Sequence, residues 1–301
     1  MTRAAIELVE TDASAGAALL EPFDEQTSFD VAAGRRRLFA LRTTPDEVAA
    51  GSAVLGGGSL DLFVHQELRA RGLGGAAAAE LLKRAGDGPL TAWSHGDHPA
   101  ARALAVRLGF ARARTLLQLR SPVDGFDRAT PARTNITTFR PGDDDAAWVA
   151  LNARVFAWHA EQGGLTQADL KQREAEPWFR ADDFLLARDD DGTMIGYCWL
   201  KIEPDEPSRR SAAAGTAPTA GSRGEDARTM ATGEIYVIGV APEASGRGLG
   251  RTLMTAGLTR LRERGCAEAE LYVEADNHNA VHLYRSLGFR DHRVHVQYAR
   301  A

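Results

Sequence analysis

Residues 233–264 read GEIYVIGVAPEASGRGLGRTLMTAGLTRLRER, a run that predicts a strand, a glycine-rich turn and a helix in succession. Residues 235–240 are apolar and rich in β-branched side chains, as in buried strands. Leucines at 249, 253, 258 and 261 then recur near helical spacing, and Gly265 is a typical helix stop. A turn that opens a helix presents free backbone N–H groups and the positive end of the helix dipole, so residues 246–250 favour a phosphate group. Arg247 and Arg251 add positive charge nearby.

The glycine spacing excludes two common phosphate-binding motifs. The turn lacks the Gly-Lys-Ser/Thr ending of a P-loop, and its glycines do not follow the G-x-G-x-x-G spacing of dinucleotide-binding folds. Downstream, residues 271–277 (LYVEADN) predict a strand that enters a polar turn, and residues 279–289 (NAVHLYRSLGF) predict a helix.

The chain has the glycine loop, then Asn277, then a helix that ends in Tyr-x-x-Leu-Gly-Phe. This order of motifs resembles the GCN5-related N-acetyltransferases (GNAT). That family has an acetyl-CoA loop with the signature Q/R-x-x-G-x-G/A. The resemblance implies an α/β fold with a mixed, α+β-type sheet. Taken by itself, the loop is also compatible with a glycine-rich helix entry that binds nothing.

The same pattern occurs earlier in the chain. Residues 62–64 take the place of 238–240, residues 71–74 (RGLG) repeat 247–250, and residues 107–110 (RLGF) match 286–289 (SLGF). We therefore expect two tandem acetyltransferase domains, at residues 1–125 and 136–301, with a linker at 126–135. Residues 204–232 have almost no large apolar side chain and are expected to form a disordered loop.

The two copies differ at the positions that carry chemistry. On the frame of the shared motifs, three positions change: Gly58 lies opposite Glu234, Ala105 opposite Tyr284, and His98 near Asn277. We therefore expect the first copy to be degenerate and non-catalytic, because it keeps the phosphate loop without the carboxylate and the phenol. Asp61, three residues from the position of Glu234, is expected to face the other side of its strand.

Composition limits the remaining classes of function. The chain is 44% hydrophobic with a formal net charge of −5, which predicts no nucleic-acid partner. Two cysteines, Cys198 and Cys266, are too few for a disulfide framework, and the histidines lack metal-ligand spacing, so no metal is expected. No apolar run has membrane-spanning length, and the first residues lack the apolar core of a signal peptide. The expectation is a cytoplasmic monomer.

The resemblance implies direct acetyl transfer from acetyl-CoA to an amine. Glu234 would act as general base for the ammonium group, and Tyr284 would act as general acid for the leaving thiolate. The residues alone leave alternatives open: Glu234 is also compatible with a solvated charge at a strand end, and Tyr284 with a packed helical aromatic. The absence of the phenol at Ala105 favours the catalytic interpretation of Tyr284.

The resemblance also implies binding residues in both copies. In the second copy acetyl-CoA would contact Ile238, Gly239, Val240, Ser245, Gly246, Arg247, Gly248, Leu249, Gly250, Arg251, Asn277, His278, Asn279, Ala280, Val281 and His282. In the first copy the corresponding residues are Leu62, Phe63, Val64, Ala70, Arg71, Gly72, Leu73, Gly74 and Gly75.

Five short segments carry a more specific resemblance: residues 161–164 (EQGG), 178–179 (WF), 199–201 (WLK), 233–240 (GEIYVIGV) and 271–274 (LYVE). With them the chain resembles, over nearly its whole length, the mycothiol synthases, which are tandem acetyltransferases. That resemblance implies an aminothiol sugar, cysteinyl-glucosaminyl-inositol, as the acceptor. The residues implied for this substrate are Asp30, Glu161, Lys201, Glu234 and Tyr272. Two alternatives stay open: an acetyltransferase for another amine, such as a protein N-terminus, and a non-enzymatic acetyl-CoA-binding regulator.

Overall fold

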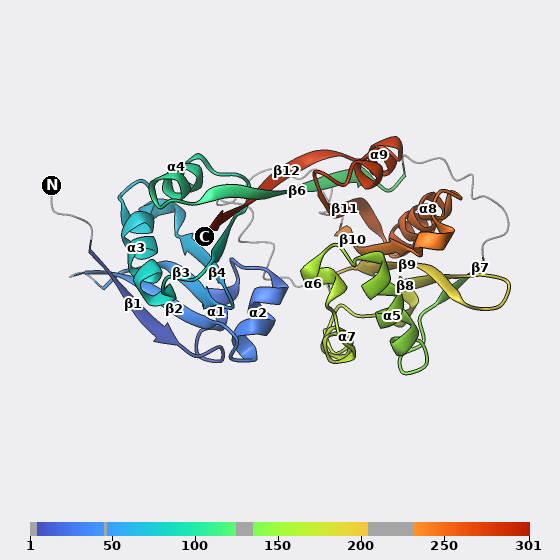
Figure 1. Cartoon of the computed structure of the whole chain (residues 1–301), viewed down its shortest axis with the longest axis horizontal. Helices are drawn as coiled ribbons and strands as arrows, with labels where there is room; N and C mark the ends of the chain where they lie inside the picture. The colour runs from blue at the N-terminus through green and yellow to red at the C-terminus, as the bar shows by residue number, and fades with distance from the viewer. Residues whose placement is uncertain (1–4, 45–46, 125–134, 204–230) are drawn as a thin grey trace, which may run out of the picture. The chain divides into compact units, whose positions relative to one another are not determined.

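The computed structural model describes residues 5–44, 47–124, 135–203 and 231–301 (Figure 1). The chain divides into two compact units: the first comprises Met1–Leu116 with Arg293–Ala301, and the second comprises Leu117–His292. The end of the chain therefore belongs to the first unit, and residues 117–124 belong to the second. The sequence predicted two consecutive domains, 1–125 and 136–301, and did not predict that the end of the chain joins the first unit.

Two expected segments fall largely outside the described residues. The structure describes only residue 135 of the linker expected at 126–135, and only residues 231 and 232 of the loop expected at 204–232. Both expectations stay predictions.

The first unit is built on a mixed sheet with the strand order β1-β2-β3-β4-β5-β12. β12 pairs antiparallel with β5, whereas β4 and β5 are parallel. Its elements are β1 (Ala5–Thr11), α1 (Ala17–Leu20), α2 (Glu25–Ala32), β2 (Arg37–Thr44), β3 (Ala49–Gly56), β4 (Ser59–Val64), α3 (Leu73–Ala85), β5 (Leu90–Ser94) and α4 (Pro99–Arg107).

Two strands begin in one unit and end in the other. They are β6 (Ala111–Pro122), which runs into the second unit, and β12 (Arg290–Arg300), which runs into the first.

The second unit repeats the arrangement with the strand order β6-β11-β10-β9-β8-β7. Figure 1 shows α8 and α9 on one side of its strands and α5, α6 and α7 on the other. Its elements are β7 (Asn135–Thr138), α5 (Asp145–Val155), α6 (Ala160–Gly163), α7 (Gln167–Glu174), β8 (Phe184–Arg188), β9 (Met194–Lys201), β10 (Ala231–Val240), α8 (Leu249–Glu263), β11 (Cys266–Glu274) and α9 (His278–Ser286).

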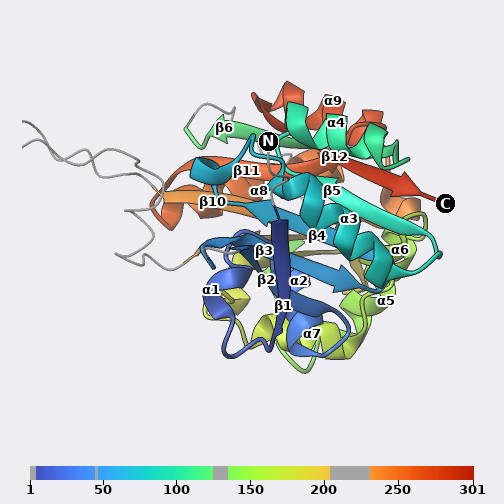
Figure 2. The ribbon, with the colours of Figure 1, turned by 90° about the vertical axis from the view of Figure 1, so that its left-hand side faces the viewer.

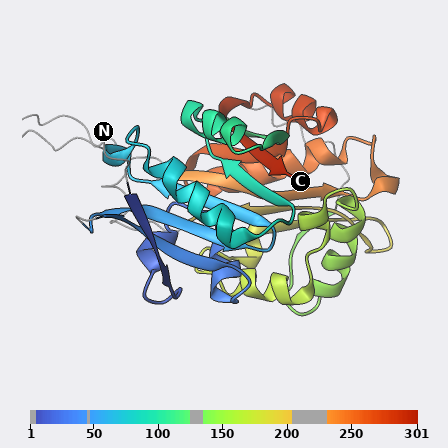
Figure 3. The same cartoon turned by 60° about the vertical axis from the view of Figure 1, so that its left-hand side comes forward.

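Each core follows from the amphipathic pattern of one long helix. α8 buries Leu249, Leu253, Leu258 and Leu261, the leucines that the sequence placed at helical spacing. Its approach to the sheet is close, because a Cβ atom on Gly257 would lie 2.8 Å from the sulfur of Cys198. In the first unit α3 lies along the strands, with α1 and α2 on the opposite face (Figures 2 and 3). The α/β fold with mixed strand pairing, expected from the sequence, is confirmed.

Among the described helices, none combines the length and the apolar character needed to cross a membrane.

Candidate active site

A β-bulge in β10 sets the geometry of the second unit. Glu234 lies opposite Lys201 of β9, and the register then shifts between Ile235 and Val237, so that Tyr236 is the extra residue. Because a bulge reverses the alternation of side chains, Glu234 and Tyr236 share the face opposite α8, whereas Val240 faces α8. A Cβ atom on Gly250 of α8 would lie 3.9 Å from the Val240 side chain, which supports this orientation.

Next to the bulge, β10 and β11 stop pairing. The parallel ladder covers residues 231–234 of β10 and ends where Glu234 meets Glu270. Both strands continue, β10 to Val240 and β11 to Glu274. Ile238 and Val240 are half-buried, as are Ala280 and Leu283 of α9, and all four pack at the margin of the core. Beyond Glu234, therefore, the backbone of β10 is paired with β9 and not with β11.

The glycine loop opens α8 as the sequence predicted. Gly246 and Gly248 have φ angles of 77° and 79°, a left-handed conformation that favours glycine, and no side chain caps the helix at Gly248. The N–H groups of the first turn are therefore available to a phosphate. Arg247 is exposed, and Arg251 donates to the Ser286 hydroxyl at 2.6 Å. The pyrophosphate contact expected at this loop stays a prediction.

Helix α9 carries the predicted acid. Asn277 caps the helix by accepting a hydrogen bond from the Ala280 N–H at 3.2 Å. Tyr284 is 7% exposed and packs near Phe289, with ring centroids 6.2 Å apart. Burial, reinforced by the nearby Cys198 thiol, raises the pKa of Tyr284 above the usual range of a phenol. Its hydroxyl stays protonated near neutral pH and is therefore able to donate a proton.

Lys201 sits on an aromatic platform beside Glu234. Its ammonium lies 5.0 Å from the ring centroid of Trp178 and 5.7 Å from that of Tyr236, and the side chain is only 13% exposed. The buried Arg173 of α7 donates from Nε to the Tyr236 hydroxyl at 2.9 Å, which fixes the ring under the ammonium. A positive charge is thus held at the strand position paired with the predicted base.

On the other side of Glu234, a carboxylate is held by residues about 150 positions earlier in the chain. Glu270 accepts from Arg120 Nη2 at 2.7 Å and from Gln118 Nε2 at 3.0 Å. Gln118 Nε2 also donates to the Tyr272 hydroxyl at 3.0 Å, and Tyr272 is 41% exposed. The exposed ring of Tyr272 is compatible with its predicted contact with substrate.

Sequence reasoning missed four polar residues of this region: Gln118, Arg120, Arg173 and Glu270. Glu268, Glu270 and Tyr272 alternate along β11, and Gln118 and Arg120 alternate along β6. This period-two pattern was a usable signal for polar residues on one sheet face. Nothing in the sequence paired Arg173 with Tyr236.

Two further predicted substrate contacts belong to α6 and α2, which contribute no residue to this cluster. Glu161 lies in α6, and its side chain is outside what the structure describes. Asp30 belongs to the first unit, where it accepts hydrogen bonds from Arg35 and Gln26. The role of each stays a prediction.

The first unit repeats the phosphate loop. Gly72 begins α3 with a φ angle of 83° and no side-chain cap. His98 caps α4 through Nδ1, as Asn277 caps α9, which supports the alignment of these two positions. Ala105 is buried at the place of Tyr284. This unit therefore has the loop without the phenol.

The structure corrects the comparison at Glu234. β4 pairs with β3 through an unbroken register, so no bulge matches the one at Tyr236. Ser59 of β4 pairs with Thr91 of β5, and Glu234 of β10 pairs with Glu270 of β11 in the same way. The structural counterpart of Glu234 is therefore Ser59, one residue after Gly58. Neither Gly58 nor Ser59 carries a carboxylate.

The expected orientation of Asp61 is wrong for the same reason. Asp61 lies opposite Val54 of β3, on the face that carries α1 and α2, and its carboxylate binds Arg36 Nη2 at 2.6 Å. This face is equivalent to the one that Glu234 occupies in the second unit. The sequence comparison counted residues along the two strands without the extra residue of the bulge in β10, and it therefore assigned Asp61 to the wrong face of the sheet.

Within the described residues, no group of three or more His, Cys, Asp or Glu side chains is arranged to hold a metal ion. The expected lack of a metal requirement stays a prediction.

Comparison with known proteins agrees with this geometry. The Acetyltransferase (GNAT) family matches residues 152–289. Among solved structures, a tandem GNAT protein from the clavulanic acid biosynthesis pathway superposes with a TM-score of 0.67 at 18% identity, covering 98% of each chain. A GCN5-related N-acetyltransferase from Sphaerobacter thermophilus gives 0.63 at 21% identity, covering 100% of this chain and 96% of the other. These likenesses establish the fold.

Sequence relatives are more specific. The mycothiol acetyltransferase of Clavibacter sepedonicus is 42% identical over 93% of this chain and 86% of its own length. The enzyme of Salinispora arenicola is 42% identical over 93% of this chain and 88% of its own length. The enzyme of Sanguibacter keddieii is 44% identical over 85% of this chain and 76% of its own length. With this identity over most of its length, the chain belongs to the mycothiol acetyltransferase family of GNAT enzymes.

Proposed function

We propose that this chain transfers acetyl from acetyl-CoA to the cysteinyl α-amine of cysteinyl-glucosaminyl-inositol, the last step of mycothiol biosynthesis. One observation carries the proposal: the second unit holds Glu234 at the point where β10 and β11 separate and buries Tyr284 on the α9 side of the sheet. The family relationship supports the choice of acceptor.

In this proposal the second unit holds acetyl-CoA along the separated strand. The pyrophosphate lies at the uncapped start of α8, and the N–H groups of residues 238–240 pair with the pantetheine arm and the acetyl carbonyl. The half-buried apolar residues Ile238, Val240 and Leu283 fit the aliphatic part of that arm. The first unit offers its own loop at Gly72 to a second acetyl-CoA and does not transfer acetyl.

The chemistry needs three proton movements. Glu234 accepts a proton from the substrate ammonium, whose pKa of roughly 8 requires only a modest shift. The free amine forms a bond to the thioester carbonyl carbon, the bond from that carbon to sulfur breaks, and Tyr284 donates its proton to the leaving thiolate. The nitrogen that has formed the new bond then loses its extra proton to the tyrosinate, which restores the phenol. Lys201 and Tyr272 supply fixed polar contacts for a hydroxyl-rich acceptor.

The test is thiol release from acetyl-CoA by the purified full chain. Cysteinyl-glucosaminyl-inositol is offered beside N-terminal peptides, for the wild type, for Glu234→Gln, and for Glu263→Gln as a control at the exposed end of α8. We expect release with the cysteinyl sugar alone, reduced about 10²- to 10⁴-fold only in Glu234→Gln. Thiol release with peptides alone would show that the acceptor is a peptide amine and not the cysteinyl sugar. Binding of acetyl-CoA without thiol release would favour a non-enzymatic acetyl-CoA-binding regulator.

A further inference from the structure

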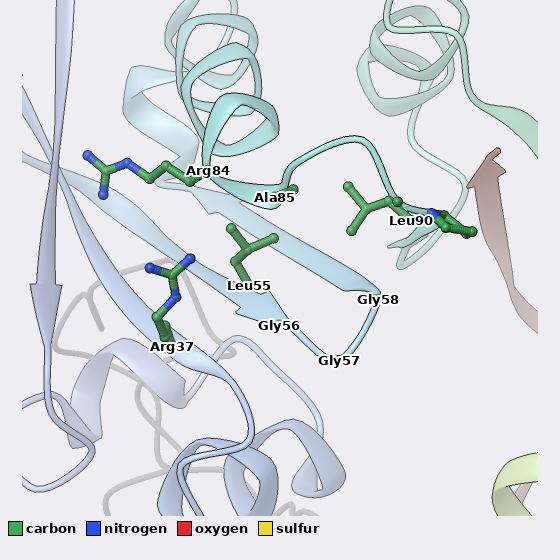
Figure 4. A pocket seen from close by; sticks show the side chains of 10 residues that line it. Arg37, Leu55, Gly56, Gly57, Gly58, Arg84, Ala85 and Leu90 are labelled. Carbon is green, nitrogen blue, oxygen red and sulfur yellow. The ribbon is translucent and has the colours of Figure 1, made fainter.

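A pocket of about 270 Å³ lies in the first unit, around the turn that joins β3 to β4. Leu55 and Leu90 give it apolar walls, and the turn Gly56–Gly58 and Gly88 give it backbone walls (Figure 4). The side chains of Arg37 and Arg84 also line it. None of these residues belongs to the acetyl-CoA loop of this unit.

The two arginines are held in place by one buried ring. The guanidinium carbon of Arg37 lies 5.4 Å from the ring centroid of Phe39, and that of Arg84 lies 5.2 Å from it. Phe39 is fully buried, so it is a fixed support for both cations. Figure 4 shows the two guanidinium groups on the same side of Leu55. Like charges gathered at one ring repel, and an anion between them relieves that repulsion.

The carboxylates of the protein neutralise the positive charges of Arg37 and Arg84 only weakly. Arg37 meets Glu10 at 3.7 Å, and both side chains are about half exposed, a geometry that contributes little. Within the described part of the chain Arg84 forms no ion pair: the neighbouring Glu80 binds Lys83 at 2.9 Å and acts on Arg84 only at longer range. The α3 carbonyls near Arg84 disfavour an anion, so the guanidinium groups have to hold it.

The glycines keep the pocket open. Gly57 and Gly58 have φ angles of 58° and 73°, so the turn itself requires them. Gly88 has no positive φ, and a Cβ atom there would meet nothing within 4 Å. Neither backbone strain nor packing accounts for glycine at position 88, whereas an open pocket does.

We propose that this pocket binds a small oxyanion, a carboxylate or a phosphate monoester, carried on an apolar ring. Two guanidinium forks provide the hydrogen-bond donors that planar or tetrahedral oxyanions need. The leucine walls accept the ring. The volume is at the lower limit of small-molecule sites, so the ligand has about one ring.

The test follows backbone amide shifts of the ¹⁵N-labelled full chain at residues 57 and 88. Phenyl phosphate and benzoate are titrated separately to distinguish the two oxyanion sources, with benzyl alcohol as the uncharged probe. We expect a Kd on the order of 1 mM for at least one anion. The affinity should fall at least 10-fold in Arg37→Gln and in Arg84→Gln, and stay unchanged in Arg42→Gln, an exposed arginine of β2 outside the pocket.

A second variant separates the pocket from surface charge. Gly88→Leu fills the space and keeps both arginines, so it should also weaken binding at least 10-fold. Equal affinity in all variants, or equal affinity for benzyl alcohol, would overturn the proposal. Binding of inorganic phosphate as tight as that of phenyl phosphate would overturn the apolar part of the ligand.

Discussion

Replacing Tyr284 by phenylalanine removes one hydroxyl from α9 and leaves the ring that packs near Phe289. Because burial raises the pKa of Tyr284, the wild-type phenol is protonated throughout the neutral range. If it protonates the leaving thiolate, its loss lowers kcat by about 10²- to 10⁴-fold, a barrier increase of roughly 3 to 5 kcal/mol. The KM for acetyl-CoA should change little, since the loop at Gly248 is untouched.

A matched control is available in the same unit. Tyr197 is fully buried, and its hydroxyl donates to Asn152 Oδ1 at 2.8 Å, on the opposite face of the sheet from α8. Tyr197→Phe removes that hydrogen bond at a cost of about 1 kcal/mol of unfolding free energy, with kcat nearly unchanged. Tyr284→Phe should show the reverse: a slow enzyme of nearly wild-type stability.

The assay combines single-turnover thiol release with urea denaturation of both variants. Single-turnover conditions measure the chemical step apart from product release. A Tyr284→Phe enzyme with the wild-type rate would refute the general-acid role. Parallel losses of rate and stability in both variants would show that Tyr284 acts through packing alone.

Three further perturbations test the packing and the charges. Asp61→Asn leaves Arg36 without its carboxylate in a buried site, so urea denaturation should show a loss of about 3 kcal/mol; a loss below 1 kcal/mol would mean that solvent reaches the pair. Burial lowers the pKa of His295 to about 4, so the unfolded chain binds more protons between pH 6.5 and 4. Stability should therefore fall by about 2 to 3 kcal/mol as pH drops through that window, and His295→Phe should flatten the curve. Gly239→Ala places a Cβ atom 2.7 Å from the Tyr197 ring, so thermal unfolding should occur several degrees lower; an unchanged Tm would contradict that contact.

Much of the fold could be predicted from local sequence. The leucine spacing of α8, the turn at Gly248 and the helix that carries Tyr284 were all predicted, because periodicity and positive-φ glycines act over a few residues. The helices α1 (Ala17–Leu20) and α2 (Glu25–Ala32) are only four and eight residues long. Short helices of this kind depend on tertiary contacts more than on propensity.

The sequence by itself determined the repeated strand–loop–helix units, the glycine loops and the loss of the phenol at Ala105. Tertiary structure alone decided the register: the bulge at Tyr236 turned Ser59 into the counterpart of Glu234 and reversed the orientation expected for Asp61. It also decided that the end of β12 pairs with β5. Local patterns constrain each residue against its near neighbours, whereas strand register and strand partners are fixed by contacts between residues far apart in the chain.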